Sequence, residues 1–287
     1  MVAAKIIFID DNEKYYIPEK FHDSLGMAWY APFITVLAKR YEAMQEVCQE
    51  SSTKNGLDVY FGDFGKSFFD WIDAERRQFV DGRLDKGFLP ILQKHKKEFN
   101  MALEVGCGSG ILANALAKRN PNATIIGIDY ADESLRKAKL HAKNENLKNV
   151  EYYGHDITSL PVEWTNRFDL VLMFDFLHDT SDPVKCVSEM KRVLMKDGLL
   201  VIADPNISSY QKKNEGNVLA SAFYSISLFN CLPNSLSKKP EAGLGIGWGF
   251  ENERDFLISQ NLEILETYDF TINEHSVLFA CKKIENV

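Results

Sequence analysis

The sequence predicts an α/β protein built on a mainly parallel, doubly wound sheet. Strand-like and helix-like segments alternate five times between residues 101 and 204. A glycine-rich turn joins the first strand to the first helix, and acidic residues stand at the ends of the next strands. Because strands joined by helices form right-handed crossovers, we expect helices on both faces of the sheet and the strand ends gathered at one edge.

The first strand and its turn lie in residues 101–110, MALEVGCGSG. An apolar run leads into three glycines at alternate positions, and residues 111–118 then show the apolar spacing of a helix. Glycine has no Cβ, so the backbone can turn sharply and a ligand can lie against bare peptide. The following helix offers unpaired N–H groups. The sequence therefore predicts a ligand site at this turn.

The side chains near the turn distinguish three classes of ligand. A phosphate-binding Walker loop requires Lys and Ser or Thr after the last glycine, where this chain has Ile111 and Leu112. A dinucleotide site has the spacing G-x-G-x-x-G, whereas the spacing here is G-x-G-x-G and Glu104 precedes it. An acid at that place favours a cationic ligand. S-adenosylmethionine fits, because it carries a sulfonium and an ammonium but no phosphate.

The later strands end in residues that suit the same ligand. The strand at residues 124–128 ends at Asp129, about 20 residues after the glycine turn, the place of an acid that holds ribose hydroxyls. The strand at 150–153 leads to Asp156, which could accept from an adenine amino group. The strand at 168–173 leads to His178.

These motifs, taken in order, resemble the class I S-adenosylmethionine-dependent methyltransferases. The resemblance covers about residues 88–287, and the stretches 222–233 and 243–249 are similar to a subgroup that has an N-terminal winged helix. It implies a Rossmann-like, seven-stranded sheet whose antiparallel edge comes from residues 262–282. It also implies S-adenosylmethionine as the cofactor. The cofactor-binding residues that we infer are Glu104, Gly106, Gly108, Gly110, Asp129, Tyr130, Asp156, Ile157 and Phe174.

His178 is the candidate catalytic residue. The sequence Leu177-His178-Asp179 resembles the His-Asp element of small-molecule O-methyltransferases, in which the histidine removes the acceptor's proton. A histidine pKa near 6.5 suits that role. The alternative is that His178 belongs to a loop at the start of a helix. No metal site is expected, because the spacing of Asp204 and Asn206 differs from the adjacent Asp-Asn of cation-dependent enzymes.

Composition limits the class of partner. Asp and Glu number 41 against 33 Lys and Arg, and the net charge of −8 disfavours nucleic acid and anionic membranes. The five cysteines are scattered without a C-x-x-C pair, so neither a disulfide framework nor a zinc site is indicated. Residues 1–10 lack the pattern of a signal peptide, and no apolar run approaches the length of a membrane span. We therefore expect a cytoplasmic protein.

We divide the chain into a mainly helical N-terminal region, 1–87, and a methyltransferase domain, 88–287, with an insertion at 205–250. Residues 5–18 predict two short strands around a polar turn, which resemble the wing of a truncated winged helix. The apolar helix face in 21–47 predicts packing against the main domain, a homodimer interface or a substrate lid. The insertion is expected to enclose the substrate.

The function that these features predict is methyl transfer from S-adenosylmethionine to a small molecule, at a hydroxyl oxygen, with nitrogen and carbon acceptors as alternatives. Two rival functions stay open at this point. One is a cofactor-binding regulatory or scaffold protein without turnover. The other is an NAD-dependent oxidoreductase, which the glycine spacing and Glu104 disfavour.

Overall fold

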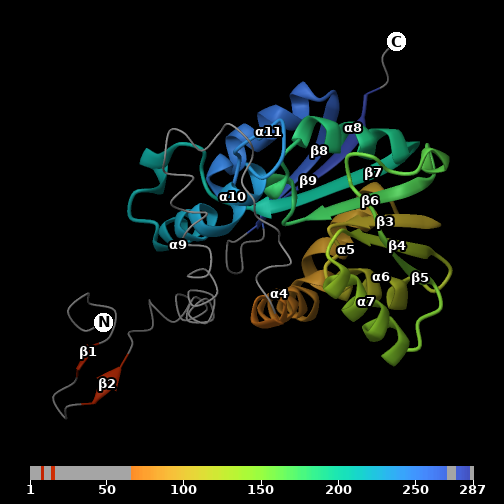
Figure 1. Ribbon diagram of the computed structural model, residues 1–287, viewed down its shortest axis with the longest axis horizontal. Helices are drawn as coiled ribbons and strands as arrows, with labels where there is room; N and C mark the ends of the chain where they lie inside the picture. Colours follow the sequence, from red (N-terminus) through yellow and green to blue (C-terminus); the bar gives the residue numbers. More distant parts are fainter. Residues whose placement is uncertain (1–7, 10–13, 17–65, 270–275, 285–287) are drawn as a thin grey trace.

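A seven-stranded sheet with the order β5-β4-β3-β6-β7-β9-β8 forms the centre of the chain (Figure 1). The computed structural model describes residues 8–9, 14–16, 66–269 and 276–284. The strands of the sheet are β3 (Met101–Val105), β4 (Thr124–Asp129), β5 (Val150–Gly154), β6 (Phe168–Phe174), β7 (Leu194–Pro205), β8 (Leu262–Asp269) and β9 (Ser276–Lys283). Strands β3 to β7 are parallel, whereas β9 pairs antiparallel with both β7 and β8. The predicted fold class and its antiparallel edge are confirmed.

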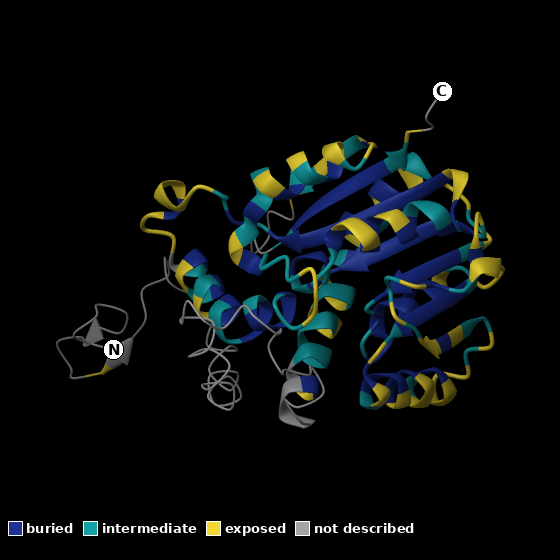
Figure 2. Cartoon of the chain, turned by 45° about the horizontal axis from the view of Figure 1, so that its top comes forward, coloured by how far each residue is buried: buried dark blue, intermediate teal, exposed yellow. Residues whose placement is uncertain are grey.

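The central strands are apolar along almost their whole length because both faces of the sheet are covered. Successive side chains point to opposite faces. In β3, Ala102 therefore joins one hydrophobic cluster, and Leu103 and Val105 join the other. Figure 2 shows the strands as buried and the outer helix faces as exposed. The sheet is thus the core on which the strand ends are held.

Helices cover both faces, as the alternation of strands and helices predicts. The helices that contribute side chains to the first cluster are α5 (Leu89–His95), α6 (Ile111–Arg119) and α7 (Asp132–Asn144). Those of the second are α8 (Pro183–Val193) and α11 (Gly249–Ser259). The Asp182 side chain caps α8 by accepting a hydrogen bond of 2.9 Å from the Lys185 N–H. The connections from α6, α7 and α8 to the strands that follow them are short. The loops that follow the strands are the ones that line the cavity described below.

Two further groups of helices meet over the carboxyl ends of the strands. One is α4 (Lys66–Phe79), which continues through the π-helix η6 (Val80–Phe88) into α5. The other lies in the predicted insertion and comprises α9 (Val218–Ile226), η10 (Ser227–Cys231) and α10 (Leu232–Ser235). A third hydrophobic cluster joins them, with Phe69 of α4 packed in the same cluster as Ala220 and Phe223 of α9. Helix α4 and the insertion, which lie far apart in the sequence, thus pack together.

The remaining elements are short. They are the 3-10 turns η7 (Val162–Trp164), η8 (Leu177–Asp179), η9 (Gln211–Asn214) and η11 (Ile246–Trp248). Strands β1 (Phe8–Ile9) and β2 (Tyr15–Tyr16) pair antiparallel, as predicted for residues 5–18. The winged-helix assignment stays a prediction, and the helix expected in 21–47, with its dimer interface, lies outside the described residues. The division at residues 87 and 88 also stays a prediction. Among the described residues, no helix has the length and apolar character needed to cross a membrane.

Candidate active site

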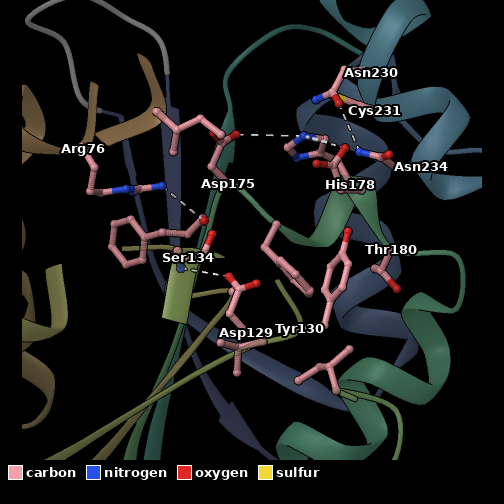
Figure 3. Close-up of a pocket in the computed structure, with 18 of the residues that line it drawn as sticks. Arg76, Asp129, Tyr130, Ser134, Asp175, His178, Thr180, Asn230, Cys231 and Asn234 are labelled. Carbon is pink, nitrogen blue, oxygen red and sulfur yellow. Dashed lines mark hydrogen bonds and ion pairs between the residues drawn. The ribbon is translucent and has the colours of Figure 1, made fainter. Parts of the chain in front are cut away.

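A cavity of about 530 Å³ opens at the carboxyl ends of the parallel strands (Figure 3). Ligands of open α/β sheets bind at this edge. Its walls come from the turns after β3, β4, β5 and β6, from α4 and from the insertion. Seven of the predicted cofactor-binding residues line it, namely Gly106, Gly108, Asp129, Tyr130, Asp156, Ile157 and Phe174, as does His178. One space therefore brings together residues from four strand ends.

The glycine turn provides a backbone wall for this cavity. Gly106 has φ +64°, and a Cβ there would overlap the ring of Phe176. Gly110 has φ +73° and caps α6 without lining the cavity, since its position is packed against Tyr152. The structure thus explains Gly110 by the fold, and its assignment to cofactor binding stays a prediction.

Asp129 is fixed against the turn by backbone N–H groups. Its Oδ2 accepts from Gly108 at 2.9 Å, and its Oδ1 accepts from Ala131 at 2.8 Å. Burial raises the pKa of this carboxyl above its usual value, although these hydrogen bonds partly oppose the shift. The neighbouring Tyr130 is 47% exposed and lines the cavity beside the acid.

Asp156 stands at the end of β5, next to Asp129 in the strand order. Its Oδ1 accepts from the Thr158 N–H at 2.8 Å and from the Thr158 hydroxyl at 2.7 Å. Burial raises the pKa of Asp156, but the hydrogen bonds from Thr158 outweigh burial and lower it below the usual range. Asp156 is therefore held as an anionic acceptor at this end of the cavity.

Glu104 is buried, with 3% exposure, and is not part of the cavity lining. It lies on β3 beside β4, the strand that ends at Asp129, so the two acids occupy neighbouring strands. Within the described chain its Oε2 has no hydrogen-bond partner. Burial raises the pKa of Glu104 to about 8, although the charge of Arg76 opposes this. Glu104 is therefore a buried carboxyl behind the turn with one unsatisfied oxygen, and its assignment to cofactor binding stays a prediction.

His178 is 3% exposed, and its Nδ1 is hydrogen-bonded to a carboxylate. Its Nδ1 lies 2.8 Å from Asp204 Oδ1. Asp204 also accepts from the backbone N–H groups of Phe176 and His178, at 3.1 and 3.3 Å. Because a carboxylate only accepts hydrogen bonds, Nδ1 carries the proton and Nε2 is the nitrogen left for an acceptor. Asp204 thus fixes the tautomer and the orientation of the ring.

Two more carboxylates lie near Nε2 of His178. Asp179 Oδ1 is 3.6 Å away, and Asp175 Oδ1 is 3.9 Å away. Asp175 has φ +54°, a strained conformation for a residue other than glycine, and strain of this kind concentrates at functional sites. Burial lowers the pKa of His178, but the charges of Asp204 and Asp179 outweigh burial and raise it well above 6.5. The acids around the ring therefore favour its doubly protonated, cationic form.

The sequence argument missed Asp204, which lies behind the cavity wall, and two groups of residues that line the cavity. Asp204 was considered as a metal ligand but not as the partner of His178, although it ends the strand next to β6. Arg76 of α4 gave no signal, because nothing local indicates which residue of a helix meets a strand end. The same holds for Asn230 and Asn234 of the insertion, whose side chains Figure 3 shows in the cavity wall. The Asn234 amide donates a hydrogen bond of 3.2 Å to Asn230 Oδ1. The insertion therefore contributes to the wall, and its role in enclosing a substrate stays a prediction.

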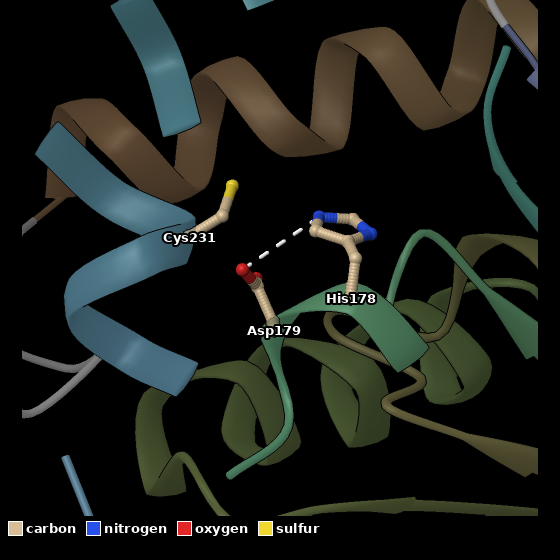
Figure 4. A group of neighbouring side chains, drawn as sticks. All are labelled: His178, Asp179 and Cys231. Atoms are coloured by element: carbon tan, nitrogen blue, oxygen red, sulfur yellow. Dashed lines mark ion pairs between the residues drawn. The ribbon is translucent and has the colours of Figure 1, made fainter. Parts of the chain in front are cut away.

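Two groups of described side chains have the composition of a metal site, namely His178, Asp179 and Cys231, and Asp175, His178 and Asp204. The nearest ligand atoms of His178, Asp179 and Cys231 lie within 4.8 Å of one another, and Figure 4 shows the three side chains facing a common space. Burial raises the pKa of the Cys231 thiol to about 12, and the charge of Asp179 adds to this. A protonated thiol is a poor ligand, since metals bind the thiolate. The expectation of a metal-free site therefore stays a prediction.

That expectation has a direct test. If His178 removes the acceptor's proton, as the sequence predicts, no Lewis acid is needed, and dialysis against a chelator should leave the activity within about twofold of the untreated rate. The residual metal would be measured by mass spectrometry on the same samples. Loss of activity that returns on adding Zn²⁺ or Mg²⁺ would contradict it.

Together, the parallel strands, the glycine turn after β3 and the cavity at the strand ends define an α/β protein with a ligand site at the carboxyl edge of its sheet. Residues 96–241 match the model of the methyltransferase domain, and the chain belongs to that family. The cofactor is S-adenosylmethionine.

Curated relatives match part of the chain. A ubiquinone biosynthesis O-methyltransferase of Psychrobacter cryohalolentis is 29% identical over 140 residues, which cover 47% of this chain and 54% of the relative. A protein of the same name from Neisseria meningitidis is 34% identical over 104 residues, 36% of this chain and 43% of the relative. The chain thus matches about half, or less, of these relatives' lengths.

Solved structures show the same fold. An O-methyltransferase family 2 protein of Planctomyces limnophilus, solved in complex with apigenin, superposes with a TM-score of 0.57 at 17% identity. The match covers 98% of this chain and 78% of that one. A SAM-dependent methyltransferase from Aquifex aeolicus superposes with a TM-score of 0.51 at 17% identity, over 74% of this chain and 98% of that one.

Proposed function

We propose that this chain transfers the methyl group of S-adenosylmethionine to a hydroxyl oxygen of a small molecule, with His178 as the general base. The observation that carries the proposal is the pair formed by His178 and Asp204 at 2.8 Å, with Nε2 left for the acceptor. A hydroxyl needs a base when it attacks carbon, whereas an uncharged amine does not. A buried, oriented imidazole therefore favours oxygen as the acceptor atom.

Each part of the cavity has a role in this reaction. Bound S-adenosylmethionine supplies a methyl group made electrophilic by its sulfonium. Asp129 would hold the ribose hydroxyls. The turn at Gly106 and Gly108 would let the cofactor lie against the protein backbone. His178 would accept the acceptor's proton at Nε2, and Asp204 would stabilise the imidazolium that results. Alignment of the acceptor with the methyl group is the other contribution of the walls.

The apolar part of the cavity wall favours a small, largely apolar molecule as the methyl acceptor. Phe69 and Ile72 of α4 and Phe223 and Ile226 of α9 line the cavity. The curated relatives carry O-methyltransferase in their names, which also favours an oxygen acceptor. The net charge of −8 disfavours a nucleic acid as the substrate. We accordingly propose a small molecule as partner and a cytoplasmic setting.

The proposal is tested by supplying methyl-labelled S-adenosylmethionine with matched sets of aromatic alcohols, amines and thiols. We expect label on hydroxyl oxygens, with release of S-adenosylhomocysteine in equal amount. Label on nitrogen alone would contradict the assignment of the acceptor atom. Binding of the cofactor with no transfer to any acceptor would favour a regulatory or scaffold role.

The rate of transfer should rise with pH. His178 must lose its proton before it can act as a base, and its pKa lies well above 6.5, because the Asp204 and Asp179 carboxylates outweigh the effect of burial. The fraction of neutral imidazole, and therefore kcat, should increase as pH rises above neutrality. A pH profile of kcat at saturating cofactor checks this. A rate that is highest near pH 6 and falls above it would contradict the base assignment.

A further inference from the structure

The side chains in front of His178 form a group of donor atoms that a general base does not require. Asp179 follows the histidine in the turn η8, and Cys231 comes from η10 of the insertion. The nearest donor atoms of the three residues lie within 4.8 Å of one another (Figure 4). Asp175, the residue after β6, adds a second carboxylate oxygen 3.9 Å from Nε2 of the ring. A nitrogen, a sulfur and carboxylate oxygens from two separate parts of the chain therefore meet at one place.

The imidazole of His178 is oriented as in a metal-binding histidine. Asp204 bonds the Nδ1 side of the ring at 2.8 Å, whereas Asp179 Oδ1 and Asp175 Oδ1 lie 3.6 and 3.9 Å from Nε2. A histidine that binds a metal through one nitrogen almost always donates its other ring N–H to a carboxylate, a carbonyl or water, which fixes the tautomer. Asp204 is therefore suited to be this outer partner, and Nε2 is the nitrogen with a lone pair for a cation.

One oxygen of Asp179 has no hydrogen bond to compensate for its burial. Within the described residues, Asp179 Oδ1 is buried without a hydrogen-bond partner, and it is the oxygen that lies 3.6 Å from His178 Nε2. Burying a carboxylate oxygen is unfavourable unless it is hydrogen-bonded, ion-paired or bound to a metal. A cation beside Nε2 would therefore satisfy this oxygen as well as the nitrogen.

The donors match zinc in type and in spacing. Zinc is bound in proteins by cysteine sulfur, histidine nitrogen and carboxylate oxygen, in most structural sites by four ligands in a tetrahedron. With Zn–N and Zn–O bonds of about 2.0 to 2.2 Å, tetrahedral geometry separates the nitrogen from an oxygen by about 3.4 Å. The observed separations of 3.6 and 3.9 Å at Nε2 are within a few tenths of an ångström of that value. A thiolate and a carboxylate would also balance the charge of a divalent ion.

The high pKa of the Cys231 thiol is compatible with such a site. Burial, with the charge of Asp179, raises that pKa to about 12 when no cation is bound. A bound cation reverses the local electrostatics, and a thiol that coordinates it loses its proton outright. Metal binding at this group would therefore release protons, as it does at other cysteine and histidine sites.

We propose that His178, Asp179 and Cys231 form a binding site for Zn²⁺, with Asp175 or water as the fourth ligand, and that the bound ion inhibits methyl transfer. The ion would take the lone pair of Nε2, which the histidine needs in order to accept a proton. The inhibition rests on the function proposed above, whereas the site itself does not. An inhibitory ion also agrees with a reaction that needs no metal.

Co²⁺ is the probe for the site, because it occupies tetrahedral zinc sites and its absorption spectrum reports a bound thiolate. Protein dialysed against a chelator would be titrated with CoCl₂, and methyl transfer would be measured separately with ZnCl₂ and with MgCl₂. The variant is Cys231→Ala. The matched control is Cys186→Ala, which removes a thiol that is also buried but packs in the second hydrophobic cluster and does not line the cavity. Each rate is compared with that of the same protein without metal.

We expect the wild-type chain and Cys186→Ala to bind Co²⁺ with a thiolate charge-transfer band, and Cys231→Ala to lose the band. The Zn²⁺ concentration for half-inhibition should rise by about 100-fold or more in Cys231→Ala, since even an outer partner of a metal ligand contributes about 10- to 100-fold to affinity. Mg²⁺ should leave the rate within about twofold, because it prefers oxygen ligands.

A wild-type spectrum without the band would overturn the site, even if Cys231→Ala did not fold. A band that persists in Cys231→Ala would overturn it too. Equal inhibition of the wild type and Cys231→Ala by Zn²⁺, or activation by Zn²⁺, would overturn the inhibitory role. The spectrum needs no turnover, so the site would still be supported by the band in a chain that transfers no methyl group, and the function proposed above would be the part that fails.

Discussion

Replacement of His178 by alanine is expected to lower kcat by about 10²- to 10⁴-fold, the usual contribution of a positioned general base. Among the described residues that line the cavity, His178 is the histidine whose ring is oriented by a hydrogen bond of 2.8 Å to a buried carboxylate, that of Asp204. The affinity for S-adenosylhomocysteine should stay within about twofold. Asp204 keeps its backbone donors at Phe176 and residue 178, so the site should not collapse.

Steady-state kinetics, calorimetry with S-adenosylhomocysteine and a thermal melt would be measured on the same preparation. The matched control is His95→Ala, which removes an imidazole that faces Glu266 and does not line the cavity. It should retain full activity. If His178→Ala keeps more than about a third of the wild-type kcat, or if it loses cofactor binding together with kcat, the histidine is not the base.

The second large effect is expected at Glu104 and concerns stability. Burial raises the pKa of this carboxyl from 4.5 to about 8 in the folded chain. Between these values the unfolded chain has lost the proton and the folded chain still holds it, so the free energy of unfolding falls as pH rises. The decline runs from about pH 4.5 to about pH 8 and then ends. Each pKa unit corresponds to about 1.4 kcal/mol.

Glu104→Gln removes this cost, because glutamine stays neutral. The variant should equal or slightly trail the wild type at pH 5 and exceed it at pH 9, by on the order of 3 kcal/mol in the free energy of unfolding. Urea denaturation of ligand-free protein at both pH values would measure the difference. Glu263→Gln, at an exposed position of β8, is the control and should show no such pH dependence. A stability gap that is the same at both pH values would contradict the raised pKa of Glu104.

Much of the fold follows from local patterns. The apolar runs at 101–105 and 168–173 and the strand ending at Asp129 were predicted within a residue or two of the observed strands. Period and glycine placement are short-range properties, and the crossover rule then places the strands in one parallel sheet with helices on both faces. The same rule explains why Asp129, Asp156 and His178, far apart in the chain, were expected at one edge and do line one cavity.

The predictions that local patterns could not make concern depth and partners. Glu104 and Gly110 belong to the predicted motif but not to the cavity lining, because the turn places one behind it and uses the other to begin α6. Which acid orients His178 depended on the pairing of β6 with β7, which brings Asp204 to the ring. The alternation of apolar and polar side chains along a strand does not indicate which side of the sheet the following loop covers.

The sequence by itself determined the class of this protein: strand, glycine turn and helix in repeated order, acids at the strand ends, and so an S-adenosylmethionine site. Only the tertiary structure decided how that site is closed. Arg76 comes from a helix before the sheet, and Asn230 and Asn234 come from the insertion between β7 and β8. The physical reason is that backbone geometry is set by neighbours in the chain, whereas burial, ion pairing and the pKa of a side chain are set by whatever long-range packing places beside it.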